Sequence, residues 1–271
     1  MRRVLLRRGS RLVAVATAAS LLALAALGSA SAAIQPGGIT DEARKMHDLF
    51  IIVLIFALVV FALVGGALVY ALIRYRRRDD ELPPQFHGGT RIEVLMVGIP
   101  AIITIALFVI SMITLVDIDD DADPDDLTIE VTGFQFSWQF AYNLNDLGLN
   151  SDPNAEGTLA IIGTPSAEPV LVMPVDEAVE FVLVSNDVIH SFYVRDFLYK
   201  LDLIPGRQND FTVTARETGD YRAQCAELCG LNHSLMRFTL RVVERAEFDA
   251  WIAEQAAKQR GDDAPLSVQA P

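Results

Sequence analysis

Cysteine, histidine and basic charge are all scarce in this chain. Its 271 residues contain two cysteines and four histidines, and 35 acidic residues outnumber 22 basic ones, for a formal net charge of −13. This acidity argues against nucleic-acid binding and favours a basic partner, because net charge governs encounter rather than fold. No Cys-x-x-Cys-His run occurs, so the sequence gives no sign of attached haem c.

The first 33 residues have an Arg-rich start, an apolar middle and small residues at Ala30, Ser31 and Ala32. This pattern is typical of a secretory signal peptide, residues 1–32, rather than of a span in the mature protein. No cysteine lies near the expected cleavage point, so we expect no lipid anchor of the lipoprotein kind. Cleavage would remove five arginines and no acidic residue, which makes the mature chain more acidic still.

Two long uncharged stretches follow, over residues 49–73 and 94–116. Each is long enough to cross a bilayer whose hydrocarbon core is about 30 Å thick. The alternative, two buried helices of a soluble protein, fits these lengths poorly. Four arginines directly after the first stretch indicate the cytoplasmic side. We therefore expect a transmembrane hairpin over 33–120, with helices near 47–74 and 92–116 and both ends outside.

From Leu127 onward, short β-branched and aromatic runs alternate with segments rich in Pro, Gly, Asn and Asp. Several short strands over about 115 residues predict an all-β sandwich or barrel. We place this domain at residues 121–245. The final segment, 246–271, is expected to hold a helix, which begins near Glu244, and then a disordered polar tail.

The string CAELCGLNHSLM, from Cys225 to Met236, holds both cysteines together with His233. Thiolate, imidazole and thioether groups favour copper, whereas hard oxygen ligands favour magnesium or calcium. A single-copper site for electron transfer needs only one cysteine. A second one in the same loop could let both sulfurs bridge two copper ions.

Two other interpretations of this loop are weaker. A disulfide between Cys225 and Cys229 would close a very short loop and gain little chain entropy. It would also leave His233 and Met236 without a purpose. Zinc is disfavoured because methionine is a poor zinc ligand and the sequence offers no second cysteine or histidine pair to complete four-coordination.

Taken together, these features resemble subunit II of the haem–copper cytochrome c oxidases, over nearly the whole mature chain. The most specific segments are SNDVIHSF around His190, KLDLIPGR at 200–207 and the cysteine loop, with weaker support from GFQFSWQFAY and RIEVLMVGIP. The resemblance implies a mixed fold, in which a cupredoxin-like Greek-key sandwich follows a two-helix transmembrane hairpin. The style of the sequence is typical of a high-GC bacterium such as an actinobacterium.

The resemblance also implies a function. Members of the family carry a binuclear copper centre, called CuA, which accepts electrons from cytochrome c and passes them to the haem of subunit I. There oxygen is reduced to water, coupled to proton pumping. The ligands implied for this chain are the bridging thiolates of Cys225 and Cys229, the imidazoles of His190 and His233, the thioether of Met236 and the backbone carbonyl of Glu227.

Further roles come from the resemblance alone. The side chain of Glu227 would bind a magnesium or manganese ion shared with subunit I, since a hard carboxylate suits that ion. Glu93 would stand at the cytoplasmic mouth of a proton pathway, and Asp187 would help to dock cytochrome c. For both glutamates the plainer alternative is a solvated surface position.

The position at which electrons are accepted departs from the family pattern. The family motif reads Gln-Trp-aromatic-Trp, and here it reads Gln135-Phe136-Ser137-Trp138. Phe136 therefore occupies the electron-accepting position, and Trp138 aligns with the second, more buried tryptophan. This departure suggests a different donor surface, such as a cytochrome c domain fixed within a larger respiratory assembly. Sheet packing is the plainer interpretation for most of these aromatic residues.

The implied partners are oxidase subunits I and III, cytochrome c and the lipid bilayer of the cell membrane, with the copper domain on the extracytoplasmic side. A copper-lacking subunit II of a quinol oxidase is disfavoured by the retained cysteines, histidines and methionine. A membrane-tethered copper carrier would need neither Glu93 nor Glu227. Nitrous oxide reductase has a similar copper loop, but it also needs a large catalytic domain that this sequence lacks.

Overall fold

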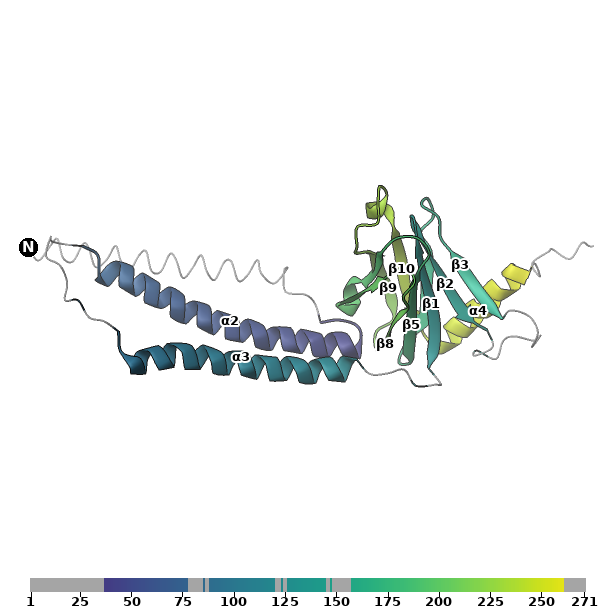
Figure 1. The fold of residues 1–271 in the computed structure, drawn as a ribbon. Coiled ribbons are helices and arrows are strands. Elements are labelled where there is room, and N and C mark those ends of the chain that lie inside the picture. The colour runs from purple at the N-terminus through teal and green to yellow at the C-terminus, as the bar shows by residue number, and fades with distance from the viewer. Residues whose placement is uncertain are drawn as a thin grey trace, which may run out of the picture. The chain divides into compact units, whose positions relative to one another are not determined.

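The computed structural model describes residues 37–77, 85, 88–119, 123, 126–144, 147 and 157–260. The expected signal peptide and the polar C-terminal tail lie outside these residues. Within them the chain forms two long helices, then ten strands in two sheets, then a final helix (Figure 1).

The two long helices are α2 (Asp41–Arg74) and α3 (Thr90–Ile118), and both are long and apolar enough to cross a membrane. Helix α2 begins ahead of the uncharged stretch because its first turn is capped. The hydroxyl of Thr40 accepts from the backbone N–H of Ala43 at 3.0 Å, and Asp41 and Glu42 complement the positive end of the helix dipole. Most apolar side chains along both helices are exposed, as suits surfaces that face lipid or a partner helix.

The strands form two five-stranded sheets, in the orders β3-β2-β1-β5-β8 and β4-β10-β9-β6-β7. Strand β1 pairs in parallel with β5, and β10 pairs in parallel with β4, while the other neighbours are antiparallel. The expected β-sandwich is thus confirmed. The bounds are β1 Leu127–Phe134, β2 Ser137–Asn143, β3 Thr158–Ile162, β4 Val170–Pro174, β5 Ala178–Ser185, β6 His190–Val194, β7 Tyr199–Leu203, β8 Asn209–Thr214, β9 Gly219–Cys225 and β10 Arg237–Val243.

The core lies between the two sheets and is rich in aromatic rings. Alternation along a strand sends every second side chain inward, and in β5 these are Val179, Phe181 and Leu183, all fully buried. The Phe192 and Phe238 rings pack 5.1 Å apart, centroid to centroid. This aromatic packing gives the strands that carry the metal-binding candidates a rigid base.

Helix α4 (Arg245–Arg260) closes one side of the sandwich. Phe248, Ile252 and Ala256 recur every four residues, share one helix face and are buried against the core. The side chain of Gln259 adds polar contacts to β3, because its amide donates to the carbonyl of Thr158 and its oxygen accepts from the backbone of Ala160.

The start of α2 is tied to the β-sandwich by backbone and side-chain bonds. The N–H of Ile39 donates to the carbonyl of Asp196 at 3.0 Å, and the N–H of Arg216 donates to the carbonyl of Ile39 at 2.8 Å. The guanidinium of Arg216 also reaches Asp41 at 2.9 Å and Asp176 at 3.0 Å. The first turn of the membrane helix is therefore anchored to the domain that holds the cysteine loop.

Candidate metal centre

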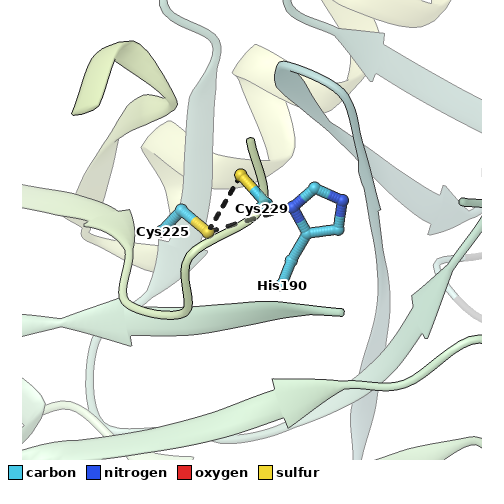
Figure 2. Close-up of side chains that lie close together, drawn as sticks. All are labelled: His190, Cys225 and Cys229. Carbon is cyan, nitrogen blue, oxygen red and sulfur yellow. Dashed lines mark hydrogen bonds between the residues drawn. The ribbon is translucent and has the colours of Figure 1, made fainter. Parts of the chain in front are cut away.

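Strand β9, the cysteine loop that follows it and strand β6 bring the candidate ligands together. The cysteine loop connects β9, which ends at Cys225, to β10 and includes a short 3₁₀ turn, η2 (His233–Leu235). Strand β6 begins at His190 and pairs with β9, with Phe192 opposite Cys225. Figure 2 shows the imidazole of His190 and the sulfurs of Cys225 and Cys229 turned toward one another.

The two sulfurs lie 3.9 Å apart and are not bonded to each other. A metal–thiolate bond is about 2.3 Å long, so sulfurs at this separation can both bind one ion. The ring nitrogen Nδ1 of His190 is 3.9 Å from Cys225 Sγ, and that of His233 is 3.6 Å from Cys229 Sγ. A different histidine thus lies beside each cysteine in these two contacts.

Two weaker donors complete the cluster. The Met236 thioether is 3.8 Å from Cys229 Sγ, and the Glu227 carbonyl is 3.2 Å from Cys225 Sγ. Ligand atoms of His190, Cys225 and Cys229 all lie within 4.8 Å of one another in a buried setting. Soft sulfur and imidazole donors in this arrangement fit copper.

The two thiols differ in acidity. Burial alone would raise the pKa of the Cys225 thiol, but hydrogen bonds with His190 and with the backbone of Ser191 outweigh burial and bring the pKa down to about 7. Burial and the nearby charge of Cys225 raise the pKa of Cys229 to about 12. Like charges resist placement side by side, so the second thiol needs a bound cation to ionise near neutral pH.

His190 is fixed by a carboxylate on its far side. Its Nε2–H donates to Asp187 Oδ1 at 2.8 Å, which leaves Nδ1 facing Cys225. Asp187 also accepts from the backbone N–H groups of Gln135 and Val188, both at 2.6 Å. Burial would raise the pKa of Asp187, but these hydrogen bonds hold it below its usual value. An imidazole oriented in this way is typical of metal-binding histidines.

The turn between β1 and β2 lies against the cysteine loop. The side-chain amide of Gln135 donates to the carbonyl of Cys229 at 2.6 Å. A Cβ atom at Gly230 would lie 3.0 Å from the ring of Phe136, so glycine permits this close approach. Trp138 is fully buried, and its Nε1–H points to the carbonyl of Met236 at 3.5 Å.

The sequence did not single out Gln135 as a contact of the loop. Its neighbours in space are far away along the chain, with 94 residues separating it from Cys229. The one signal was its place immediately before Phe136, the expected electron-accepting residue. Polar residues are usual in turns between strands, so only the folded chain reveals the contacts of Gln135.

Of the two glutamates that the family resemblance singled out, Glu227 lies in the cysteine loop and Glu93 does not. Glu227 is half-buried within the loop, and its carbonyl faces the cysteines. Glu93 lies apart from the loop in the first turn of α3, where Oε1 accepts from the backbone N–H of Gly89 at 3.3 Å. That contact satisfies one backbone N–H at the start of the helix, where the N-cap residue Gly89 has no side chain that could accept a hydrogen bond.

Exposed apolar side chains lie in the cysteine loop and directly before His190. Leu228 and Leu231 are 77% and 93% exposed, and Leu235, Val188 and Ile189 are exposed as well. We call these five residues the apolar rim. Clustered exposed apolar groups beside polar ones mark surfaces that contact another protein.

Fold and site define a class: a cupredoxin-like copper domain joined to two membrane-type helices. The family model for the periplasmic domain of cytochrome c oxidase subunit II matches residues 127–243, and the model for its transmembrane domain matches residues 30–114. The chain belongs to the cytochrome c oxidase subunit II family, whose members are parts of a haem–copper oxidoreductase. It is accordingly a membrane protein with an extracytoplasmic domain, and a copper centre fits its buried His/Cys/Cys cluster.

Individual relatives agree with this assignment. The chain is 34% identical over 224 residues to a probable cytochrome c oxidase subunit 2 of Rickettsia bellii, a match that covers 80% of each chain. It is 33% identical over 261 residues to that of the actinobacterium Streptomyces avermitilis, covering 86% of this chain and 82% of the other. A crystal structure of the periplasmic domain of subunit II of Bradyrhizobium japonicum cytochrome oxidase is 32% identical, with a TM-score of 0.42, covering 52% of this chain and 98% of that one.

Proposed function

We propose that the cysteine loop and His190 bind two copper ions, bridged by Cys225 and Cys229. The observation that carries this proposal is the placement of a different imidazole beside each sulfur, at 3.9 Å and 3.6 Å, around sulfurs only 3.9 Å apart. A single-copper site for electron transfer needs only one thiolate, so a second buried cysteine beside the first favours a pair of ions. Met236 and the carbonyl of Glu227 supply one weak donor on each side.

A bound copper pair would take up and release single electrons. The surrounding residues favour such transfer because they hold the ligands in nearly the same positions in both charge states of the copper pair. Asp187 fixes the ring of His190, the aromatic core supports β6 and β9, and burial of the cysteines excludes water. Donors held in this way need little reorganisation, which favours fast electron transfer.

We propose cytochrome c, free or as a domain of a larger respiratory assembly, as the electron donor, and the haem of subunit I as the acceptor. The apolar rim supports a protein interface beside the copper site, because it would otherwise expose several large apolar groups to water. We propose Phe136 as the electron-accepting position, and the closeness of its ring to the loop at Gly230 supports this role. Asp187 lies at the same edge and is 30% exposed, which leaves it available to a basic donor.

Other parts of the assembly follow from the family membership. We propose that the Glu227 carboxylate binds a magnesium or manganese ion shared with subunit I, since a hard oxygen ligand suits either ion. We also propose that Glu93, at the start of α3, stands at the mouth of a proton pathway, and that subunit III is a further partner. The hairpin would lie in the cell membrane, with the copper domain outside the cytoplasm.

A Cys225→Ser variant tests the electron-transfer role in the intact oxidase. Rapid mixing with reduced cytochrome c should show electron uptake in the wild type and essentially none in the variant. Assembly with subunit I should be unchanged, because the helical hairpin is untouched. Ser234→Ala in the same loop is the matched control and should accept electrons normally. Wild-type uptake by Cys225→Ser would contradict the proposal.

A further inference from the structure

Gln135 joins the two sides of the metal centre. Its side-chain amide donates to the carbonyl of Cys229 at 2.6 Å, and its backbone N–H donates to Asp187 Oδ2 at 2.6 Å. The other oxygen of Asp187 accepts from His190 Nε2 at 2.8 Å. A continuous hydrogen-bonded chain therefore runs from one candidate ligand, His190, to another, Cys229, through a residue on a different segment.

The two bonds of Gln135 come from different parts of the residue. The bond to Asp187 uses the backbone and survives any side-chain substitution. The bond to Cys229 uses the side chain alone, and Gly230 leaves room for it, because a Cβ there would lie 2.9 Å from Gln135 Nε2. Gly230 also has a φ of +137°, a backbone conformation that residues other than glycine rarely adopt. The loop is thus shaped to receive this amide.

We infer that Gln135 is a positioning residue of the copper centre, holding the Cys229 side of the loop in register with the His190 side. The inference rests on the proposed copper function. The amide fixes the Cys229 peptide and with it the direction in which the sulfur points. The backbone bond fixes the same turn to the carboxylate that orients His190, so the separation of the two ligands is set by one short turn, in which Gln135 is exposed and Phe136 is half-buried.

This role differs from that of an ordinary structural contact. A hydrogen bond that merely stabilises the fold would affect the chain with and without copper alike. Loss of a bond that sets the position of a sulfur would change the copper pair itself, because the metal–sulfur geometry determines the spectrum and the reduction potential of the pair. The same hydrogen bond also connects Cys229 to the residue that directly precedes Phe136.

The test compares Gln135→Ala and Gln135→Glu in the full chain within the oxidase. Glutamate keeps the length of the side chain but presents an oxygen to the Cys229 carbonyl, so it replaces a donor with a repulsive contact. Gln224→Ala is the matched control, because it removes an exposed glutamine next to Cys225 on the outer face of β9. The readouts are the electron paramagnetic resonance pattern, the reduction potential and the rate of copper loss to a chelator.

We expect copper loss to be about fivefold faster in Gln135→Ala and about tenfold faster in Gln135→Glu. Both variants should show an altered resonance pattern and a shifted potential, and Gln224→Ala should match the wild type. A lower unfolding temperature of the copper-free variants, with spectrum, potential and copper loss unchanged, would overturn the inference. A wild type without a copper-pair signature would instead overturn the proposed function itself.

Discussion

The carboxylate of Asp187 lies 2.8 Å from Nε2 of His190 and turns the other ring nitrogen toward Cys225. This bond requires the proton of the neutral ring to sit on Nε2, which leaves the lone pair of Nδ1 for a metal. The ring itself is fully buried, so the orientation is imposed by the protein and not by solvent.

Asp187→Asn tests that relationship. Asparagine can offer either its oxygen or its NH₂ group to the ring, so the orientation and proton position of His190 are no longer imposed. We expect copper to be held about tenfold more weakly, in line with other losses of a carboxylate behind a metal-binding histidine. Competition with a copper chelator measures the effect. Wild-type affinity would show that the carboxylate does not support the ligand.

Gly230→Ala should disturb the loop without unfolding the sandwich. Its positive φ would cost a side chain about 1–3 kcal/mol, and the added Cβ would meet Gln135 and Phe136 at 2.9 and 3.0 Å. Thermal unfolding and the copper spectrum together measure the result. Gly206→Ala is the control, because Gly206 also has a positive φ, +77°, with no atom within 4 Å of the new Cβ. An unaltered copper spectrum in Gly230→Ala would argue against a close fit at this point.

Copper uptake should depend on pH with a defined sign. The binding form is the thiolate, and the pKa of Cys225 is lowered to about 7 while that of Cys229 is raised to about 12. Loading should therefore weaken as pH falls below about 7, where both thiols hold their protons, and should release protons as copper binds. A pH indicator in weak buffer measures the release. Loading that improves on acidification would contradict thiolate ligation.

The junction between α2 and the sandwich predicts a second pH effect. Arg216 and the carboxylate of Asp41 form an ion pair, which stabilises the fold while the carboxylate is ionised and loses its effect as the carboxylate is protonated. Both groups are about one-third exposed, and we expect at most about 1 kcal/mol. The unfolding temperature of Arg216→Gln should fall below that of the wild type at pH 7, and the gap should be smaller at pH 3, where more of Asp41 is protonated. An equal gap at both pH values would contradict the ion pair.

Phe136→Ala tests where electrons are accepted. The aromatic ring next to Gly230 is the proposed contact with the donor, so its loss should slow electron uptake from cytochrome c while copper content stays constant. Rapid-mixing kinetics with varied cytochrome c concentration measure this effect. An unchanged concentration dependence would show that electrons reach the copper site by another surface.

The sequence predicted those parts of the molecule that are encoded in short stretches. Uncharged runs longer than a bilayer is thick predicted α2 and α3, and alternation predicted the sandwich. Cys225, Cys229, His233 and Met236 lie within one loop, so their spacing alone indicated a metal site. His190 is 35 residues away from Cys225 and was reached only through the family resemblance.

Contacts between distant segments could not be predicted in this way. The bond from Gln135 to Cys229 depends on where the β1–β2 turn falls against the cysteine loop, and the bond from Arg216 to Asp41 spans 175 residues. Neither leaves a periodic pattern in the sequence, because each depends on how two sheets or a helix and a sheet are stacked. For the same reason Asp187 was expected only as a docking residue, from the family resemblance, and not as the hydrogen-bond partner of His190.

Copper content measured together with the electron paramagnetic resonance spectrum of the purified oxidase tests the central claim most directly. Comparison of the wild type with Cys229→Ser, after allowing for other copper in the complex, isolates the metal held by this chain. Two sulfur-bridged ions predict two coppers lost in the variant, together with a resonance pattern in which one unpaired electron is shared by two nuclei. The loss of one copper, with a pattern from a single nucleus, would contradict the claim.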